Sequence, residues 1–448
     1  MSWHRAGLLF VVLAAGCFDD HGRLDDAGGT LEADAGVERE DAGALADGSV
    51  PAAPCTTVCE PPRLLARVSL DLTHSLRPAV LDAVVHRDDL VVSLLAGDLS
   101  GGADPTPEFF LARISRRTGE ARIEVIDYPT STMSIGAAAL TSRGESLALM
   151  MVFAANATLP YLQPQVRVVT WEGADPTPTA FQRALTEFPL DRCYGCFRRG
   201  ASVAIGETGG LAVLADEGVL RVSRVELSEG TLTREAIDVP SVSPNTALDA
   251  RADRSASGIL AIGGARAIPA ASASPALAMV ATESTLEPAI PVPGATDDAT
   301  PHPWLRSGAL ELVRFVRDAG FSRGRLRRYV LEGSEFTEVG AIETAGDLPP
   351  LAITSISSAL VWIESSLTAI GESDLRILSS PPRTCGRVSP ESSVHLPTPL
   401  ATGFDHRVMT ATEADGRSYV ALLEQAPGAL DTADLVVFDL GVCRDTTP

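Results

Sequence analysis

The chain has 448 residues, with 58 acidic against 36 basic side chains and a formal net charge of −22. Nucleic acids and anionic lipid surfaces attract basic patches, so this charge argues against both as direct partners. Every basic residue is an arginine, which excludes reactions that need a lysine, such as Schiff-base formation or phosphate binding by a P-loop.

The first predicted element is an apolar run over residues 8–17, LLFVVLAAGC, which follows Arg5. A basic start, a short apolar core and small residues before a cleavage point are the layout of a secretory signal. The run is too short to cross a bilayer, which takes about 20 apolar residues. The sequence therefore predicts export.

The run ends in Ala14-Ala15-Gly16-Cys17, which resembles the lipobox of bacterial lipoproteins, although that family prefers leucine where Ala14 stands. In that family the cysteine is acylated and becomes the mature N-terminus. The resemblance implies a signal peptide over residues 1–16 and a lipid on Cys17. It also implies anchoring in a bacterial cell envelope, on the periplasmic face or at the cell surface. The alternative is an ordinary cleaved signal in which Cys17 has no special role.

Residues 18–54 differ in composition from the rest of the chain. They hold ten acidic residues against two arginines, and Asp-Ala-Gly recurs at Asp26, Asp34 and Asp41. Such a segment buries too little apolar area to offset the entropy of ordering, and its like charges extend it. We therefore predict that residues 17–60 form a lipidated, acidic, disordered tether. A calcium-binding run is the alternative, but the spacing of calcium-ligand loops is absent.

From residue 61 onward, short β-type runs alternate with Gly, Pro and Asp. The most apolar run of each neighbourhood recurs about every 55 residues, beginning at Leu90, Leu147, Leu211, Ile259, Leu310, Leu360 and Tyr419. A strand of small or mixed residues precedes most of these runs, and an alternating strand and a weaker one follow. Four strands per unit and seven units predict an all-β, seven-bladed β-propeller over residues 61–448. Rings of six or eight blades and a pair of β-sandwich domains are the alternatives.

The two ends of this predicted body complement each other. The last unit has only three strands, near Val408, Tyr419 and Leu435, which leaves its outer position empty. The first strand-like run, residues 63–72, precedes the first complete unit. We predict that this run fills the empty position and closes the ring, which removes open sheet edges.

Six cysteines remain once Cys17 is assigned to lipid, and an even number in an exported chain indicates disulfides. We predict bonds between neighbours in sequence, namely Cys55–Cys59, Cys193–Cys196 and Cys385–Cys443, although six cysteines allow fifteen pairings. A redox pair and a zinc site are alternatives for Cys193 and Cys196. Phe197 stands where a c-type haem site has histidine. No metal and no cofactor is expected.

The usual catalytic motifs do not occur, including HExxH, G-x-S-x-G and G-x-G-x-x-G, and no catalytic residue is assigned. The mouth of the axial channel is the usual site in a propeller. Several residues fall on or just before the predicted innermost strands: His86, Asp249, Arg251, His302, Trp304, Asp405 and His406. They either converge in a polar, partly aromatic funnel or lie at unrelated depths.

These patterns predict a monomeric, envelope-anchored lipoprotein that is not an enzyme. Its propeller would bind an unidentified protein or glycan, or serve as a scaffold. The alternative is an exported carbohydrate lyase or hydrolase with its site at the propeller axis, which rests only on analogy with other propellers.

Overall fold

The computed structural model describes the following residues: 56–71, 77–97, 108–126, 134–154, 165–172, 182–189, 201–216, 218–239, 247–252, 260–266, 277–281, 290–293, 301–306, 309–317, 324–344, 348–365, 372–379, 393–394, 398–404, 406, 408–427, 432–441 and 443–446. The predicted signal peptide, Cys17 and residues 18–54 lie outside these ranges, as do Cys55, Cys193, Cys196 and Cys385. The chain divides into two compact units, Met1–Ala52 and Ala53–Pro448, and all described residues belong to the second.

Every regular element among the described residues is a β-strand, and the strands pair antiparallel. They form seven sheets of four or five strands, numbered here as blades 1 to 7, and a separate two-stranded sheet. The two-stranded sheet consists of β1 (Thr56–Cys59) and β31 (Cys443–Thr446).

The strands of the blades, from the inside outward, are as follows: blade 1, β3 (Arg77–His86), β4 (Asp89–Gly97), β5 (Glu108–Ser115) and β6 (Ala121–Ile126); blade 2, β7 (Ser134–Arg143), β8 (Ser146–Ala154), β9 (Gln165–Glu172) and β10 (Gln182–Pro189); blade 3, β11 (Ala201–Ile205), β12 (Gly209–Asp216), β13 (Val219–Glu226) and β14 (Thr231–Asp238); blade 4, β15 (Ala247–Ala252), β16 (Leu260–Arg266), β17 (Leu277–Ala281) and β18 (Ile290–Pro291); blade 5, β19 (His302–Arg306), β20 (Ala309–Arg317), β21 (Gly324–Glu332) and β22 (Glu335–Glu343); blade 6, β23 (Ala352–Ile356), β24 (Ala359–Ser365), β25 (Ser373–Ser379) and, both paired with β25, β26 (Ser393–Val394) and β27 (Thr398–Pro399); blade 7, β28 (Met409–Ala414), β29 (Arg417–Glu424), β30 (Thr432–Asp439) and β2 (Arg63–Asp71).

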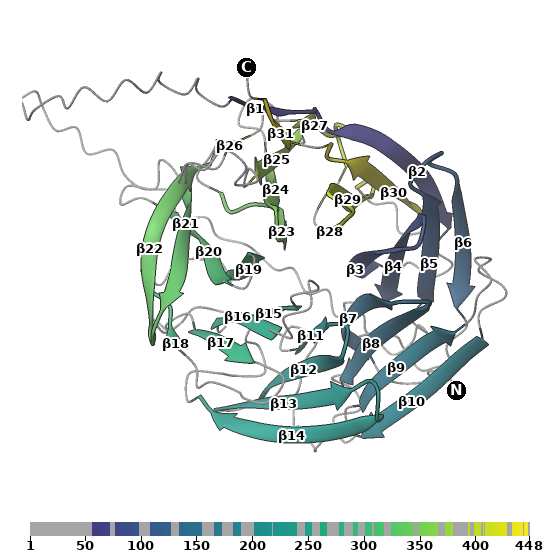
Figure 1. Cartoon of the computed structure of the whole chain (residues 1–448), viewed down its shortest axis with the longest axis vertical. Coiled ribbons are helices and arrows are strands. Elements are labelled where there is room, and N and C mark those ends of the chain that lie inside the picture. The colour runs from purple at the N-terminus through teal and green to yellow at the C-terminus, as the bar shows by residue number, and fades with distance from the viewer. Residues whose placement is uncertain are drawn as a thin grey trace, which may run out of the picture. The chain divides into compact units, whose positions relative to one another are not determined.

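The first strand of each blade lies nearest the centre of the ring (Figure 1). Contacts between these inner strands run from β3 through β7, β11, β15, β19 and β23 to β28, and then from β28 back to β3. A closed circle of inner strands is the arrangement of a β-propeller. The predicted all-β propeller fold is confirmed, and the alternative of two β-sandwich domains is wrong.

The second strand of each blade explains the repeat in the sequence. In β8, Leu147 and Leu149 pack in the core between blades 1 and 2, whereas Ala148 and Met150 pack in the core between blades 2 and 3. Successive side chains of a strand point to opposite faces of its sheet. A strand held between two other blades is therefore apolar at every position, and each of the seven apolar runs is the second strand of a blade.

Blade 7 is completed by β2, from the other end of the described chain. β2 pairs with β30, from Arg63 opposite Asp439 to Asp71 opposite Thr432. Ala66 and Leu70 of β2 are buried in the core between blades 7 and 1. The predicted closure of the ring by the strand near residue 67 is confirmed.

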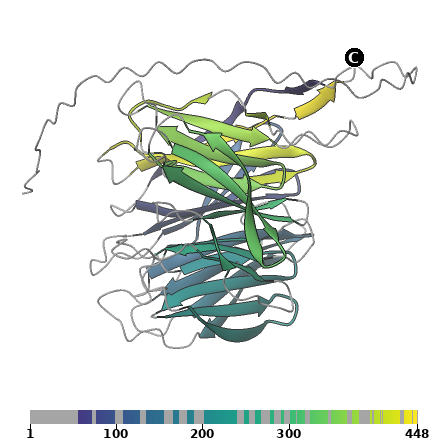
Figure 2. The ribbon, with the colours of Figure 1, turned by 90° about the vertical axis from the view of Figure 1, so that its left-hand side faces the viewer.

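The two chain segments that meet in blade 7 continue together beyond it. They form β1 and β31, drawn in purple and yellow near the C-terminus in Figure 2. Within the described part of the chain, no helix is long and apolar enough to cross a membrane.

Candidate functional site

Polar side chains on the innermost strands reach from one blade to the next. A side chain on an inner strand points toward one or the other neighbouring blade, so its partner lies about one repeat away along the chain. We call the residues that make such contacts the blade-linking residues: Asp82, His86, Ser142, Ser202, Asp249, His302, Ser355, Thr410 and Glu413.

His302 is the centre of a line of three hydrogen-bonded side chains from blades 4, 5 and 6. Its Nδ1 lies 2.5 Å from Oδ2 of Asp249 on β15, and its Nε2 lies 3.0 Å from Oγ of Ser355 on β23. Arg251, two residues after Asp249, brings its Nε within 3.2 Å of the other Asp249 oxygen. The side chain of His302 is 1% exposed, against 25% for Asp249 and 29% for Arg251.

The electrostatics of this line favour a neutral histidine beside an ionised aspartate. Burial lowers the pKa of His302 below its ordinary value, and the Asp249 carboxylate opposes that shift only in part. Burial raises the pKa of Asp249, but Arg251 and His302 outweigh it and hold that pKa below its ordinary value. In the neutral ring, Nδ1–H donates to Asp249 and Nε2 accepts the Ser355 hydroxyl proton.

The order Asp249–His302–Ser355 is that of a Ser-His-Asp triad, in which the histidine activates the serine hydroxyl. Here the serine has a second acceptor, because Ser355 Oγ also lies 3.0 Å from the carbonyl oxygen of Pro303 in blade 5. The histidine itself is enclosed between blades. The line therefore acts first as a fastening that joins blades 4, 5 and 6.

Trp304, also on β19, belongs to the core between blades 5 and 6. It is fully buried, and its indole Nε1 donates to the carbonyl oxygen of Ile356 at 2.7 Å. The Arg328 guanidinium carbon lies 5.4 Å from the ring centroid, within the range of a cation–π contact. Trp304 therefore holds two blades together instead of lining a funnel.

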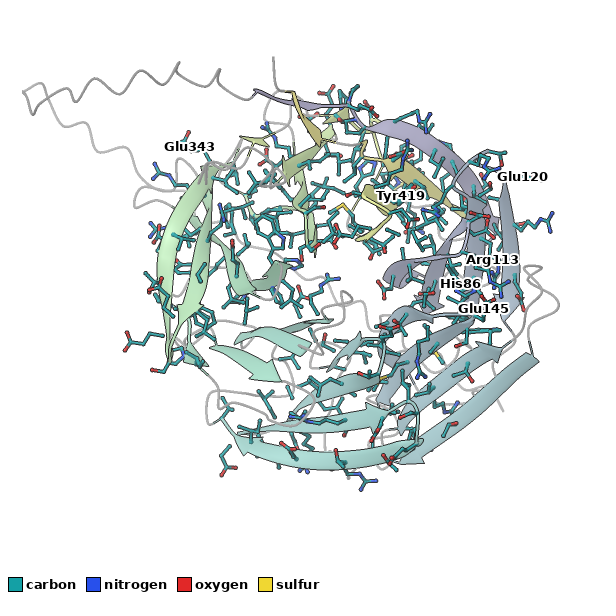
Figure 3. All side chains as sticks on the ribbon, viewed as in Figure 1. His86, Arg113, Glu120, Glu145, Glu343 and Tyr419 are labelled. Carbon is teal, nitrogen blue, oxygen red and sulfur yellow. The ribbon has the colours of Figure 1, made fainter. Side chains whose placement is uncertain are left out.

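His86 occupies the junction between blades 1 and 2, at the end of β3. Its Nδ1 lies 2.9 Å from Oγ of Ser142 on β7. Burial, and then the charges of Arg113 and Arg87, lower the pKa of His86 to about 4. Figure 3 shows His86 beside Arg113 and close to Glu145, which forms an ion pair with Arg87. This histidine is neutral at pH 7.

His406 is fully buried at the junction between blades 6 and 7. Its Nδ1 lies 2.8 Å from Oγ of Ser373 on β25, and its Nε2 lies 3.4 Å from a carboxylate oxygen of Glu424 on β29. Its side chain is 0% exposed. His406 thus repeats the histidine–serine pairing between blades that His86 and His302 make.

Asp82 on β3 was not singled out from the sequence, yet it links three blades. Its Oδ2 accepts the backbone N–H of Leu140 in blade 2 at 2.7 Å. Its Oδ1 accepts the backbone N–H of Ala83 at 2.9 Å and the hydroxyl of Thr410 in blade 7 at 3.2 Å. The available signal was a carboxylate within a strand of small and apolar residues, where only a group with partners can be buried.

The predicted funnel residues therefore do not converge on one point. Asp249, Arg251 and His302 come together, whereas His86 and His406 hydrogen-bond other partners in other blades. Asp405 lies outside the described residues. Among the residues that the structure describes, no group of three or more His, Cys, Asp or Glu side chains is placed to hold a metal ion.

Comparisons with known proteins give similarity at the level of the fold. No protein-family model matches the chain, and no curated protein matches it. A Trypanosoma rangeli sialidase in complex with the inhibitor DANA is 12% identical, with a TM-score of 0.42 over 87% of this chain and 60% of the sialidase. The polysaccharide lyase Uly1 is 14% identical, with a TM-score of 0.46 over 80% of this chain and 89% of the lyase. An endosialidase of phage phi92 is 8% identical, with a TM-score of 0.43 over 84% of this chain and 69% of the endosialidase.

The chain spans 60% of the length of that sialidase. Identities and TM-scores of this size carry no argument about activity. The assignment of the fold rests on the strand order and on the closed circle of inner strands described above.

Proposed function

We propose that this chain is a lipid-anchored protein of a bacterial cell envelope whose propeller binds a protein or a glycan, or serves as a scaffold, without catalysing a reaction. The observation that carries the non-catalytic part is the engagement of three histidines between blades. His86, His302 and His406 each hydrogen-bond a serine of a neighbouring blade. A general base must reach a substrate proton, and a ring buried between blades is poorly placed for that.

The anchoring part of the proposal is supported by the sequence. The apolar run that ends in Cys17 resembles a lipobox, and the acidic segment after it has the composition of a spacer. A lipid on Cys17 and an extended tether would hold the propeller away from the membrane surface, as a monomer available to partners.

The test of the non-catalytic part compares binding with turnover on the same glycans. The full chain carrying Cys17→Ser is mixed with peptidoglycan and with neutral, sialylated and uronate polysaccharides, and bound protein and released sugars are both measured. Saturable binding without new reducing ends, free sialic acid or unsaturated uronate supports the proposal. Turnover that Asp249→Asn abolishes, and that the exposed-site control Asp88→Asn retains, overturns it.

A carbohydrate lyase or hydrolase is the second candidate, and one observation favours it. Asp249 and Arg251 remain partly exposed on inner strand β15, and the Asp249 pKa is held low. An ionised carboxylate beside an arginine is suited to accept a proton or to stabilise positive charge on a sugar. The turnover measurement above decides between the two candidates.

A further inference from the structure

The two ends of the propeller chain leave blade 7 side by side. Arg63, the first residue of β2, lies opposite Asp439, the last residue of β30. The segments beyond them pair again as β1 and β31, with Thr56 opposite Thr446 and Cys59 opposite Cys443. The register of this short antiparallel sheet thus places two cysteines directly opposite each other.

Asp439 fixes the point from which both segments leave the blade. Its carboxylate is 4% exposed, and its Oδ2 lies 3.2 Å from the Arg63 guanidinium of β2 and 2.8 Å from the Arg417 guanidinium of β29. Its Oδ1 accepts the backbone N–H of Gly441 at 3.0 Å. One buried carboxylate therefore holds the start of β2 and the turn that leads from β30 to β31.

Gly441 shows how closely the two segments approach just before the cysteines. A Cβ atom at this position would lie 2.7 Å from the Cβ of Glu60 and 3.0 Å from its carbonyl oxygen. The φ angle of Gly441 is +75°, which glycine adopts without strain. The close approach and the register are independent observations that bring the neighbourhoods of Cys59 and Cys443 together.

We propose that Cys59 and Cys443 form a disulfide that fastens the two ends of the propeller chain. Residues directly opposite each other in an antiparallel pair have Cα atoms about 4.5–5.5 Å apart, within the range of about 4.4–6.8 Å that disulfides span. Their Cβ atoms lie on the same face of the sheet. The bond therefore forms without moving the backbone of either segment.

The reaction needs an oxidant of the disulfide class. Each thiol loses one proton and one electron, the S–S bond forms, and a protein disulfide or oxidised glutathione takes up both electrons to give two thiols. The proposal departs from the expected pairing of Cys55 with Cys59 and of Cys385 with Cys443. It is independent of the proposed function, because the purified chain can be oxidised by glutathione.

Mass spectrometry without reduction tests the pairing directly. The full chain with Cys17→Ser and Cys55→Ser is oxidised with glutathione disulfide, its free thiols are alkylated, and it is digested with trypsin, which cuts after arginine. Cys59, Cys443 and Cys385 then lie alone in peptides 40–63, 418–444 and 384–387. A bond between 40–63 and 418–444 is expected. A bond between 418–444 and 384–387, or an alkylated Cys443, overturns the proposal.

The matched control retains Cys55 and carries Cys17→Ser with Cys59→Ser. Peptide 40–63 should then no longer be joined to peptide 418–444, because only residue 59 lies opposite residue 443. A bond that persists through Cys55 would overturn the proposal.

Thermal unfolding gives a second, independent readout. Cys59→Ser, Cys443→Ser and the double variant, all in the oxidised Cys17→Ser chain, should lower Tm by the same amount, about 5 °C. A single shared bond makes the two substitutions non-additive. Falls in Tm that add in the double variant, or no fall at all, would overturn the proposal.

Discussion

At the scale of single residues, one carboxylate holds three blades together. Asp82 is 5% exposed and accepts hydrogen bonds from Ala83, from Leu140 of blade 2 and from Thr410 of blade 7. A buried charge is tolerated only where donors surround it. The three donors here belong to three blades, so this side chain senses whether the ring is assembled.

We expect Asp82→Asn to destabilise the protein by about 2–4 kcal/mol. The amide would turn an N–H group toward the N–H of Leu140 or toward the donors on the other oxygen, so at least one buried donor loses its acceptor. Chemical unfolding at pH 7 measures the change. Asp88→Asn, at an exposed turn position next to β3, is the control and should change the stability by less than about 0.5 kcal/mol. Equal effects of the two variants would contradict the role of Asp82.

His86 should make the stability depend on pH between about 4 and 6.5. The pKa of His86 is about 4 in the folded protein against an ordinary 6.5, so the unfolded chain binds this proton first as the pH falls. The contribution is fully present above pH 6.5 and is lost on acidification toward pH 4. Between pH 7 and pH 4.5 the loss is about 2–3 kcal/mol at most.

The measurement is the free energy of unfolding at pH 7 and pH 4.5 for the wild type and for His86→Asn. Carboxylates also titrate in this range, and the comparison cancels their contribution. The variant should lose less stability on acidification than the wild type. Parallel losses would show that His86 does not titrate as its burial implies.

The sequence located His86, Asp249 and His302 on inner strands, but it did not identify their partners. The separation between partners is about one repeat, such as 53 residues between Asp249 and His302. Many serines and carboxylates lie at that distance, and only the relative height of neighbouring blades selects among them. Whether two side chains at one junction meet depends on a shift of one or two residues, which the repeat does not determine.

At the scale of elements, β2 is the strand on which closure of the ring depends. It contributes Ala66 and Leu70 to the core between blades 7 and 1. Arg67 of β2 places its Nη1 2.5 Å from Glu424 and 3.0 Å from Asp434. Leu64, on the same strand, is 51% exposed. One face of β2 is thus docked while the other meets solvent.

Two leucines of β2 therefore offer a matched test. Leu70→Asp should cost about 4 kcal/mol, because it removes a buried side chain and introduces a charge into the core between the first and last blades. Leu64→Asp should cost less than about 1 kcal/mol. Thermal unfolding followed by circular dichroism measures both. Similar small effects would mean that β2 contributes little to blade 7.

Some strands were predictable and others were not, for a physical reason. The second strands are buried on both faces, so their apolar runs stand out, as in β12, where Leu211 to Ala215 are all buried. β10 lies at the outer edge of blade 2 and reads QRALTEFP, without a clear alternation. β26 and β27 have two residues each. These outer strands are defined by pairing with a neighbour and not by their own pattern.

At the scale of the whole molecule, Cys17 decides where the protein resides if the proposed anchoring is correct. We expect Cys17→Ser to move the protein from the membrane fraction to the soluble fraction, because the acyl chains supply the membrane affinity. Fractionation followed by immunoblotting measures the distribution. Cys55→Ser is the matched control and should leave it unchanged. A Cys17→Ser protein that stays with the membranes would contradict the lipid anchor.

The whole-molecule architecture was accessible from the sequence because each blade repeats the same burial problem. Seven apolar runs gave the number of second strands, and the incomplete last unit pointed to the strand that completes it. The polar fastening between blades was not accessible in this way, because residues such as Asp82 and Ser202 occupy single junctions and do not recur at every repeat.

The way blade 7 is built also sets the order of events during synthesis. β2 appears near the beginning of the chain, whereas its partner β30 ends at Asp439. A chain that emerges N-terminus first must carry β2 without a partner until nearly all other strands exist. Pairings so distant in sequence form slowly, and unpaired strands invite association with other chains. The last strands to emerge therefore control how long the nascent protein remains exposed to aggregation, and shortening the C-terminal end would leave the first strand without a sheet to join.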